Sequence, residues 1–257
     1  TLAANVRGAV KASTHASCKN NANAYSCPKF KFTNASGNST TYNVTNCVAE
    51  RTNDAYTDVS PSTSPLSFVY SPAGSPCPTN PIVPLTDSKS TLKTAITNLN
   101  AAGTTAGHIG IAWGWYMVSP NFGYLFPGSS QPNSYGDKKT MKVAVLMTDG
   151  EFNTQYCNGV VSKDSSGAAT SERINCNAPN GSSFAQAATL CANMKKAGVI
   201  VYSVGFGLTT GGQAETTLKN CASSTSAPYF NNAKSGSDLK AVFKQIAKSI
   251  SQLKIAH

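Results

Sequence analysis

The chain has 257 residues, of which 40% are hydrophobic and 12% are charged, and 21 basic residues outnumber 11 acidic ones. This composition supports a hydrophobic core and excludes a wholly disordered chain, while 20 glycines are too few for collagen. No apolar run reaches the length of about 18 residues that a membrane span needs, and the scattered basic residues predict no nucleic-acid partner.

Residues 1–84 are predicted to form an irregular, cysteine-bearing region. The segment is rich in Asn, Ser and Thr, and prolines are closely spaced between Ser60 and Pro84. Proline disfavours helix and interrupts strand ladders. We therefore expect short strands and loops held by disulfides.

From residue 85 onward the pattern changes to helices and strands. Leu92, Ile96 and Leu99 predict an amphipathic helix that is capped at Asp87 or Ser88 and stops at Gly103. A second helix is expected over 109–118, ending before Pro120, and the core is expected to hold its aromatic residues Trp113, Trp115 and Tyr116.

The apolar run 143–147 predicts a strand buried on both faces, as in parallel sheets. Alternating strands and helices predict an α/β, doubly wound architecture for residues 85–257. The remaining expected elements are a helix over 183–197, a strand over 199–204, a helix over 213–221, a short strand at 229–230 and a final helix capped by Ser237. In that last helix Lys240, Lys244 and Lys248 recur every four residues, which favours a solvated face and leaves an anionic partner as the alternative.

The cysteine count is even, and no CxxC pair of the zinc-binding kind occurs. These features favour disulfides and an oxidising compartment, with free buried thiols as the alternative. We expect the first four cysteines to pair among themselves, and the last four to form the pairs 157–176 and 191–221. The candidates are Cys18, Cys27, Cys47, Cys77, Cys157, Cys176, Cys191 and Cys221.

Two segments carry candidate ligand chemistry. Asp149 follows the predicted strand 143–148, where doubly wound sheets bind ligands, and Thr105 lies in a glycine-flanked turn before a helix. A carboxylate and a hydroxyl suit Mg²⁺ or Mn²⁺ better than Zn²⁺. A turn or helix-cap role is the alternative for Asp149.

The segment Val143-Ala-Val-Leu-Met-Thr-Asp-Gly-Glu151 resembles the fourth-strand motif of von Willebrand factor type A domains, and Gly103-Thr-Thr105 resembles their threonine motif. More specifically, the chain is similar to TadG-type proteins of the bacterial tight-adherence (Flp) pilus assembly system. The matching stretches include Cys47-Val-Ala-Glu-Arg-Thr52, Ile109-Gly-Ile-Ala-Trp-Gly-Trp115, Thr148-Asp-Gly-Glu-Phe-Asn-Thr154 and Ile246-Ala-Lys-Ser-Ile-Ser-Gln-Leu253.

The resemblance implies a metal-ion-dependent adhesion site built from three loops, with Thr105 in the second and Asp149 in the third. Asp58-Val-Ser60-Pro-Ser62 matches the letters of the first loop, Asp-x-Ser-x-Ser. However, no buried strand precedes it and its prolines prevent the helix that should follow, so we interpret the match as fortuitous. We expect the true first loop, the first three strands, the first helix and a membrane anchor to precede residue 1. On this interpretation the domain and its cation site are incomplete, and the strand 143–148 is an exposed edge.

The resemblance implies a non-enzymatic adhesion or protein-binding module. Its expected partners are pilus or cell-envelope components, and its expected location is the bacterial periplasm or cell surface. One alternative is a structural domain of the pilus machinery that binds no metal. The other is a metal-dependent hydrolase, for which the sequence contains no HExxH, GxSxG or phosphate-loop motif.

Overall fold

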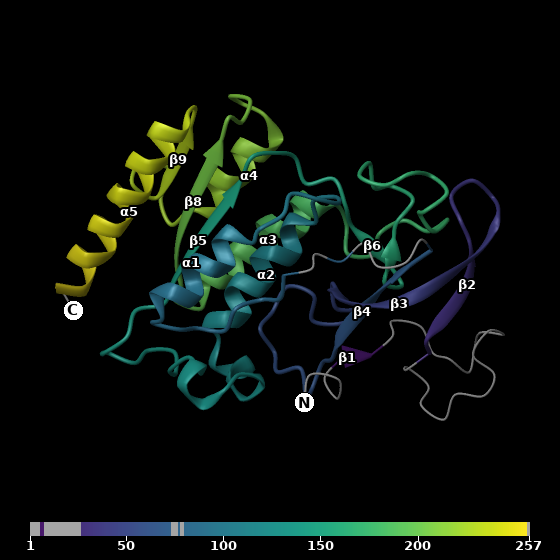
Figure 1. The fold of residues 1–257 in the computed structure, drawn as a ribbon, viewed down its shortest axis with the longest axis horizontal. Helices are drawn as coiled ribbons and strands as arrows, with labels where there is room; N and C mark the ends of the chain where they lie inside the picture. The colour runs from purple at the N-terminus through teal and green to yellow at the C-terminus, as the bar shows by residue number, and fades with distance from the viewer. Residues whose placement is uncertain (1–5, 8–26, 73–76, 78–79, 256–257) are drawn as a thin grey trace.

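The computed structural model describes residues 6–7, 27–72, 77 and 80–255, and the chain folds into two units that lie side by side (Figure 1). We call them the α/β unit, which contains the parallel sheet β5-β8-β9, and the β unit, which contains the sheet β1-β4-β3-β2 and the hairpin β6-β7. Cys18, His15 and His257 lie outside the described residues.

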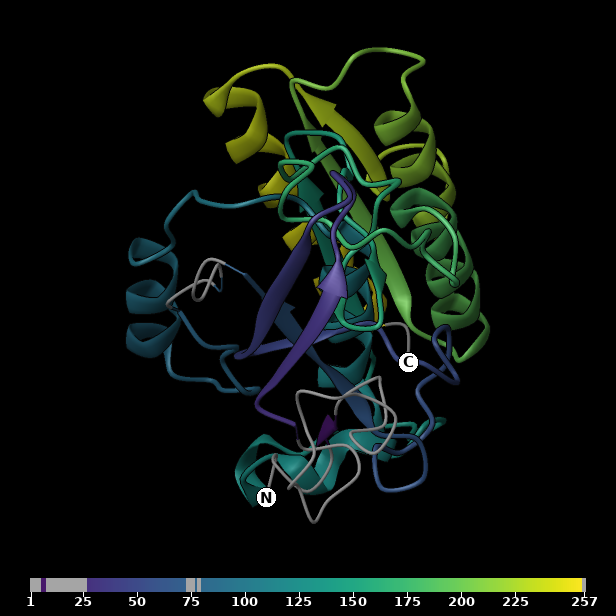
Figure 2. The same ribbon diagram turned by 90° about the vertical axis from the view of Figure 1, so that its right-hand side faces the viewer.

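The α/β unit is a parallel three-stranded sheet with helices on both faces, which confirms the α/β class predicted from the sequence. Its strands are β5 (Val143–Thr148), β8 (Ile200–Phe206) and β9 (Phe230–Ala233). One face packs against α2 (Gly107–Val118), α3 (Ser183–Lys196) and α4 (Gln213–Cys221), and the other packs against α5 (Gly236–Ile255). Figure 2 shows α3 and α4 together on one side of the sheet.

The central strand β8 explains why both helix layers form. Val201 joins the core beneath α2, α3 and α4, whereas Tyr202 and Val204 join the core beneath α5. Successive side chains of a strand point to opposite faces, so an unbroken apolar run buries both. The helices predicted over 109–118, 183–197 and 213–221 form within three residues of the expected ends, and Trp115 and Tyr116 are buried as expected.

The expectation that strand 143–147 is buried on both faces is wrong. Ala144 and Leu146 are buried, but Val145 and Met147 keep 41% and 48% of their surface exposed. In the described part of the chain β5 pairs only with β8, and α5 packs over β8 and β9, with Val143 at the start of β5 packed against the same core. The strand is therefore an edge strand with one open face.

The helix predicted from Leu92, Ile96 and Leu99 forms, but it is shorter than expected. Helix α1 (Lys89–Thr97) is capped by Ser88 and ends well before Gly103. It buries none of its residues, and Ile96 and the following Leu99 are 68% and 72% exposed.

The cap predicted for the final helix, α5, also differs from the structure. The hydroxyl of Ser235, rather than that of Ser237, accepts the backbone N–H of Asp238, at 3.1 Å.

The segment before residue 84 contains the expected strands and a disulfide, but residues 29–49 and 66–71 are more regular than the predicted irregular region. These residues form β2 (Lys29–Thr33), β3 (Ser39–Ala49) and β4 (Leu66–Ser71), paired in antiparallel fashion, and β1 (Val6–Arg7) pairs in parallel with β4. The core of this sheet holds Phe30, Tyr42 and Tyr70.

The β unit also uses a segment from beyond β5. The hairpin β6 (Tyr156–Cys157) and β7 (Val160–Val161) turns at Asn158-Gly159, both with positive φ, which is the usual chemistry of a two-residue hairpin turn. A Cβ on Gly159 would lie 2.4 Å from the carbonyl oxygen of Phe68, so only glycine fits there. Val160 and Ile174 complete the core of the β unit.

Two short 3₁₀ helices, η4 (Pro120–Leu125) and η5 (Gly128–Ser130), lie in the connection between α2 and β5.

Disulfides fasten both units. Cys47 is bonded to Cys77, Cys157 to Cys176 and Cys191 to Cys221, and the last two are the pairs expected from the sequence. Cys27 is also disulfide-bonded. None of the described helices combines the length and hydrophobicity needed to cross a bilayer.

Candidate ligand site at the carboxyl end of the parallel sheet

The three parallel strands end at one edge of the sheet, and the loops that carry the two predicted ligand residues meet there. Thr105 lies two residues before α2, and Asp149 follows directly after β5. The backbone N–H of Thr105 donates to Oδ1 of Asn153 at 2.8 Å. The carbonyl oxygen of Thr105 accepts from the N–H groups of Asn153 and Thr154, at 3.0 and 3.1 Å. The structure therefore joins the Thr105 loop to the loop after Asp149.

Both candidate side chains are exposed at this edge. Asp149 sits in a tight turn in which the N–H of Gly150 donates to the hydroxyl of Thr148 at 3.3 Å. A hydroxyl and a carboxylate on adjoining loops are suitable donors for a hard cation.

These donors alone do not fit a firmly held magnesium ion. Within the described residues, no three His, Cys, Asp or Glu side chains gather closely enough to form a metal-binding group. Thr105 and Asp149 supply one hydroxyl and one carboxylate, so a cation there would depend on water or on a carboxylate from another molecule.

A second carboxylate at the same edge is already occupied by the protein. Glu215 of α4 accepts the N–H of Gly211 at 2.8 Å, the amide of Asn232 at 3.2 Å and the ammonium of Lys219 at 3.3 Å. These bonds hold the pKa of Glu215 below its ordinary value, and the backbone N–H of Gly211 is the largest cause. Glu215 therefore fixes the loop after β8 and is not free to bind a cation.

The structure places Asp58 away from this edge, in agreement with the interpretation that its motif is fortuitous. Asp58 accepts hydrogen bonds from the hydroxyl of Tyr135 at 2.6 Å and from the side chains of Ser119 and Asn121, which follow α2. Thr105 precedes the opposite end of that 12-residue helix, which is about 18 Å long. Asp58 thus fastens the chain at the far end of α2.

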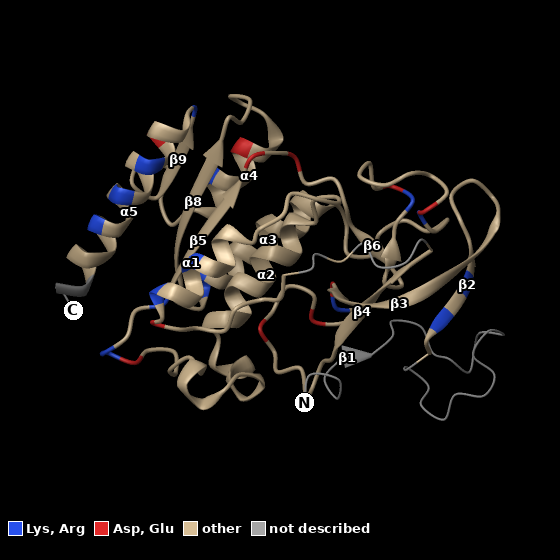
Figure 3. Cartoon of the chain, in the orientation of Figure 1, with Lys and Arg blue, Asp and Glu red and all other residues tan. Residues whose placement is uncertain are grey.

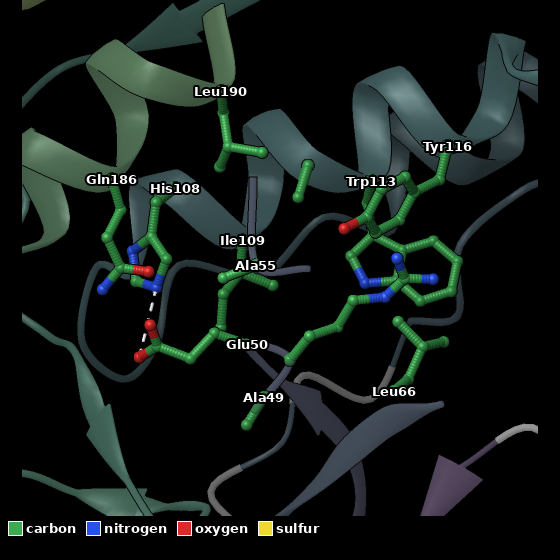
Figure 4. A pocket seen from close by; sticks show the side chains of 12 residues that line it. Ala49, Glu50, Ala55, Leu66, His108, Ile109, Trp113, Tyr116, Gln186 and Leu190 are labelled. Carbon is green, nitrogen blue, oxygen red and sulfur yellow. Dashed lines mark ion pairs between the residues drawn. The ribbon is translucent and has the colours of Figure 1, made fainter. Parts of the chain in front are cut away.

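A buried polar cluster that the sequence did not reveal links the two units (Figure 4). Glu50, which directly follows β3, lies with its Oε1 3.6 Å from Nε2 of His108 in α2. Nδ1 of His108 is 2.7 Å from the hydroxyl of Ser183 in α3. Glu50 also accepts the N–H of Tyr156 at 2.6 Å and the amide of Asn180 at 3.3 Å. We call this group the Glu50 clamp.

The Glu50 clamp has the residue types of a Ser–His–carboxylate relay, but its position excludes a substrate. His108 is 1% exposed, and Ser183 is fully buried. The cavity lined by Glu50 and His108 has a volume of about 10 Å³, which is room for about one water molecule. Glu50 and His108 lie 58 positions apart in the chain, and His108 and Ser183 lie 75 positions apart, so no local motif indicated the Glu50 clamp.

Arg51, the neighbour of Glu50, packs at the same junction between the β unit and the α/β unit. Arg51 is 1% exposed, donates to the carbonyl oxygen of Val59 at 2.5 Å and places its guanidinium 5.3 and 5.2 Å from the ring centres of Tyr116 and Phe122. Burial lowers its pKa, and the hydroxyl of Tyr116 opposes that change. Its Nε and Nη1 have no hydrogen-bond partner among the described residues.

No protein-family model matches the chain, and no curated protein matches it in sequence. Among solved structures, the open conformation of the pilus adhesin SpaC from Lactobacillus rhamnosus GG is similar over 63% of this chain and 21% of that chain, with 17% identity and a TM-score of 0.41. Proximal thread matrix protein 1 from the mussel byssus, with a zinc-occupied MIDAS motif, is similar over 63% of this chain and 31% of that chain, with 21% identity and a TM-score of 0.36. The chain thus spans less than a third of either matched chain, and similarity at this level identifies neither a family nor a function.

Proposed function

We propose that the chain is a non-enzymatic protein-binding module of the von Willebrand factor type A kind, which binds its partner through a divalent cation at the Thr105–Asp149 edge. The observation that carries this proposal is the set of three hydrogen bonds that join the Thr105 loop to the loop after Asp149. They join the hydroxyl-bearing turn to Asn153 and Thr154 in the loop that begins at Asp149, and parallel α/β sheets bind ligands at this edge.

The proposed cation is Mg²⁺ or Mn²⁺, which prefers oxygen donors. Thr105 and Asp149 would hold it on the side of this chain. Because this pair lacks a second carboxylate, an acidic group of the partner would supply part of the coordination. Binding of the cation and binding of the partner would therefore depend on each other.

The finer proposal is a role in adhesion within a bacterial tight-adherence pilus system, in the periplasm or on the cell surface. Its support is the sequence resemblance, from the Cys47 motif to the final helix. The disulfides of both units agree with an oxidising compartment. The partner would be a protein of the pilus or cell envelope.

Two alternative functions make different predictions. A structural domain that binds no metal would not respond to a change at Asp149. A metal-dependent hydrolase would activate water on a cation held by several protein ligands, and among the described residues no three His, Cys, Asp or Glu side chains form such a group. The non-enzymatic module is therefore the better-supported function.

Calorimetric titration with MgCl₂ and MnCl₂ tests the proposal. We expect weak, saturable binding that strengthens when acetate is added as a carboxylate donor, and that Asp149→Ala abolishes. Asp87→Ala is the matched control, because Asp87 is also an exposed carboxylate but lies just before α1. If both variants bind the cation as the unmodified chain does, the Thr105–Asp149 edge is not the site. Tight binding of Mg²⁺ without added carboxylate would contradict the dependence on a partner.

A further inference from the structure

The Glu50 clamp reaches the two chain segments that carry the candidate ligand residues. The Oε1 atom of Glu50 lies 3.6 Å from Nε2 of His108 and accepts the backbone N–H of Tyr156 at 2.6 Å. His108 follows Thr105 by three positions, in the first turn of α2, and Tyr156 follows Asp149 by seven positions. A single carboxylate oxygen next to β3 therefore contacts both the segment that continues from Thr105 and the segment that continues from Asp149.

The segment that ends at Tyr156 is held tightly enough to connect Glu50 with the ligand edge. Two of its residues, Asn153 and Thr154, donate their N–H groups to the carbonyl oxygen of Thr105, as described above. The carbonyl oxygen of Asn153 accepts the N–H of Gly167 at 2.9 Å, and a Cβ on Gly167 would overlap the Asn153 amide. The segment is thus bonded to the Thr105 loop at one end and to Glu50 at the other.

Apolar packing brings the start of α3 to the same place. A Cβ on Gly107, the first residue of α2, would overlap the ring of Phe152. The ring of Phe152 in turn stacks on that of Phe184 in the first turn of α3, with ring centres 5.0 Å apart. Asn180, which precedes α3, donates its amide to Oε2 of Glu50 at 3.3 Å. Three segments of the α/β unit therefore meet here, and each gives Glu50 one polar group.

The charge of Glu50 makes these contacts necessary. Its side chain is 7% exposed, and His108 is the only basic side chain among the described residues that lies close to its carboxylate. The lysines of α5 lie on the side of the α/β unit away from the β unit (Figure 3). A buried carboxylate is costly unless polar groups surround it, so the fold is stable only while His108, Tyr156 and Asn180 stay within reach.

We infer that Glu50 is a positioning residue for the ligand edge, which acts through His108 and Tyr156 to set the spacing of the Thr105 and Asp149 turns. The β unit is then part of the support of the edge. By linkage, a ligand that fixes this spacing also stabilises the contacts of Glu50. The inference rests on the proposed function only where cation binding is measured, because the order of the loops does not require a ligand.

Residue-resolved hydrogen exchange of the whole chain, without added metal, tests the inference. In Glu50→Ala the N–H groups of Asn153 and Thr154 should exchange at least about tenfold faster than in the unmodified chain, because local opening no longer breaks contacts with Glu50. The matched control is Arg51→Ala, which weakens the same junction but at the far end of α2, beside Tyr116. In Arg51→Ala these two N–H groups should exchange as in the unmodified chain.

A core amide shows how closely the two variants match in stability. The N–H of Val201 in β8 donates to the hydroxyl of Ser223 at 2.9 Å and reports opening of the whole fold. If Glu50→Ala does not fold, Glu50→Gln replaces it, since glutamine keeps an acceptor for the N–H of Tyr156 but removes the charge. Exchange at Asn153 and Thr154 should then be faster than in Arg51→Ala by about threefold.

Calorimetric titration with MnCl₂ in the presence of acetate gives a second readout. Glu50→Ala should raise the Kd for Mn²⁺ at least about fivefold, and Arg51→Ala should leave it within about twofold of the unmodified chain. The difference is expected because Arg51 contacts neither of the two segments that carry the turns, whereas Glu50 contacts both.

Two results would overturn the inference. The first is equal exchange of the Asn153 and Thr154 amides in the Glu50 and Arg51 variants, each shown by circular dichroism to be folded. The second is an unchanged Kd for Mn²⁺ in Glu50→Ala when the unmodified chain binds measurably. Absence of Mn²⁺ binding by the unmodified chain would refute the proposed cation site instead, and the exchange experiment alone would then decide whether Glu50 positions the loops.

Discussion

The Glu50 clamp gives the most demanding test of how the two units are held together. The Glu50 carboxylate has 7% of its side-chain surface exposed and accepts two hydrogen bonds, besides lying 3.6 Å from His108. Hydrogen bonds to a charged group contribute about 1.5–3 kcal/mol each, and neutral ones about 0.5–1.5 kcal/mol. Glu50→Gln keeps an acceptor but removes the charge, so it should lower the free energy of unfolding by about 2 kcal/mol.

Removing the whole Glu50 side chain should lower the free energy of unfolding further. Glu50→Ala leaves the N–H of Tyr156, the amide of Asn180 and the ring of His108 without their buried partner, and we expect a loss of about 3–5 kcal/mol. The assay is urea unfolding followed by the fluorescence of Trp113 and Trp115. Both tryptophans lie in α2, on the same helix as His108.

The matched control is Glu172→Ala. Glu172 is a partly exposed carboxylate of the β unit that accepts one backbone N–H at 3.2 Å, and its removal should change stability by no more than about 0.5 kcal/mol. If Glu50→Ala lowers the free energy of unfolding by no more than Glu172→Ala does, the Glu50 clamp does not stabilise the junction between the two units, and the reasoning from burial and hydrogen bonding is wrong.

Three further substitutions test other parts of the fold by urea unfolding. Replacing Cys191 and Cys221 by Ala removes a disulfide between residues 30 positions apart and should lower the free energy of unfolding by about 3.6 kcal/mol, because the unfolded chain gains conformational entropy. A loss below about 1 kcal/mol would contradict this entropic explanation. Glu215→Gln should destabilise the chain near neutral pH, because a carboxylate with a lowered pKa stabilises the fold at pH values above its ordinary pKa of 4.5. The difference in the free energy of unfolding between the variant and the unmodified chain should vanish as the pH falls through the pKa of Glu215 in the folded state. A constant difference down to about pH 2 would refute the role given to the Glu215 carboxylate. Arg51→Met should change the free energy of unfolding by less than about 1 kcal/mol, because it removes a buried charge whose Nε and Nη1 have no hydrogen-bond partner among the described residues but keeps most of the packing. Arg51→Ala should cost about 2–4 kcal/mol through the space left beside Tyr116.

The sequence predicted the α/β unit well because its elements carry strong periodic patterns. Helix α3 buries Phe184, Leu190 and Met194, which the periodicity assigned to its inner side. The sequence also predicted β5 as a strand, and the family resemblance predicted its exposed edge. The apolar run by itself indicated burial on both faces, because such a run shows that a strand prefers burial and not which neighbours are present to bury it.

The sequence predicted short strands before residue 84 but not the sheet and core of the β unit, because many of these residues resemble loop residues. Strand β3 (Ser39–Ala49) is rich in Ser, Thr and Asn, and its β-branched residues Thr41, Val44 and Thr45 were the available signal. The dipeptide Asn158-Gly159 was a second signal, typical of a hairpin. The Glu50 clamp could not be predicted, because hydrogen-bond partners so far apart in the chain become neighbours only through the tertiary fold.

The placement of Val160 and Ile174 in the core of the β unit bears on how the chain is made. These residues follow β5, so the chain leaves the α/β unit, completes the β unit and returns to form α3. Phe30 and Tyr42 must wait for a segment synthesised more than 100 residues later before their packing is complete. Such long-range contacts slow folding and expose apolar surface in the meantime. No single cut along the chain separates the two units, and we expect expression of residues 27–84 alone to yield a β sheet without the remainder of its core.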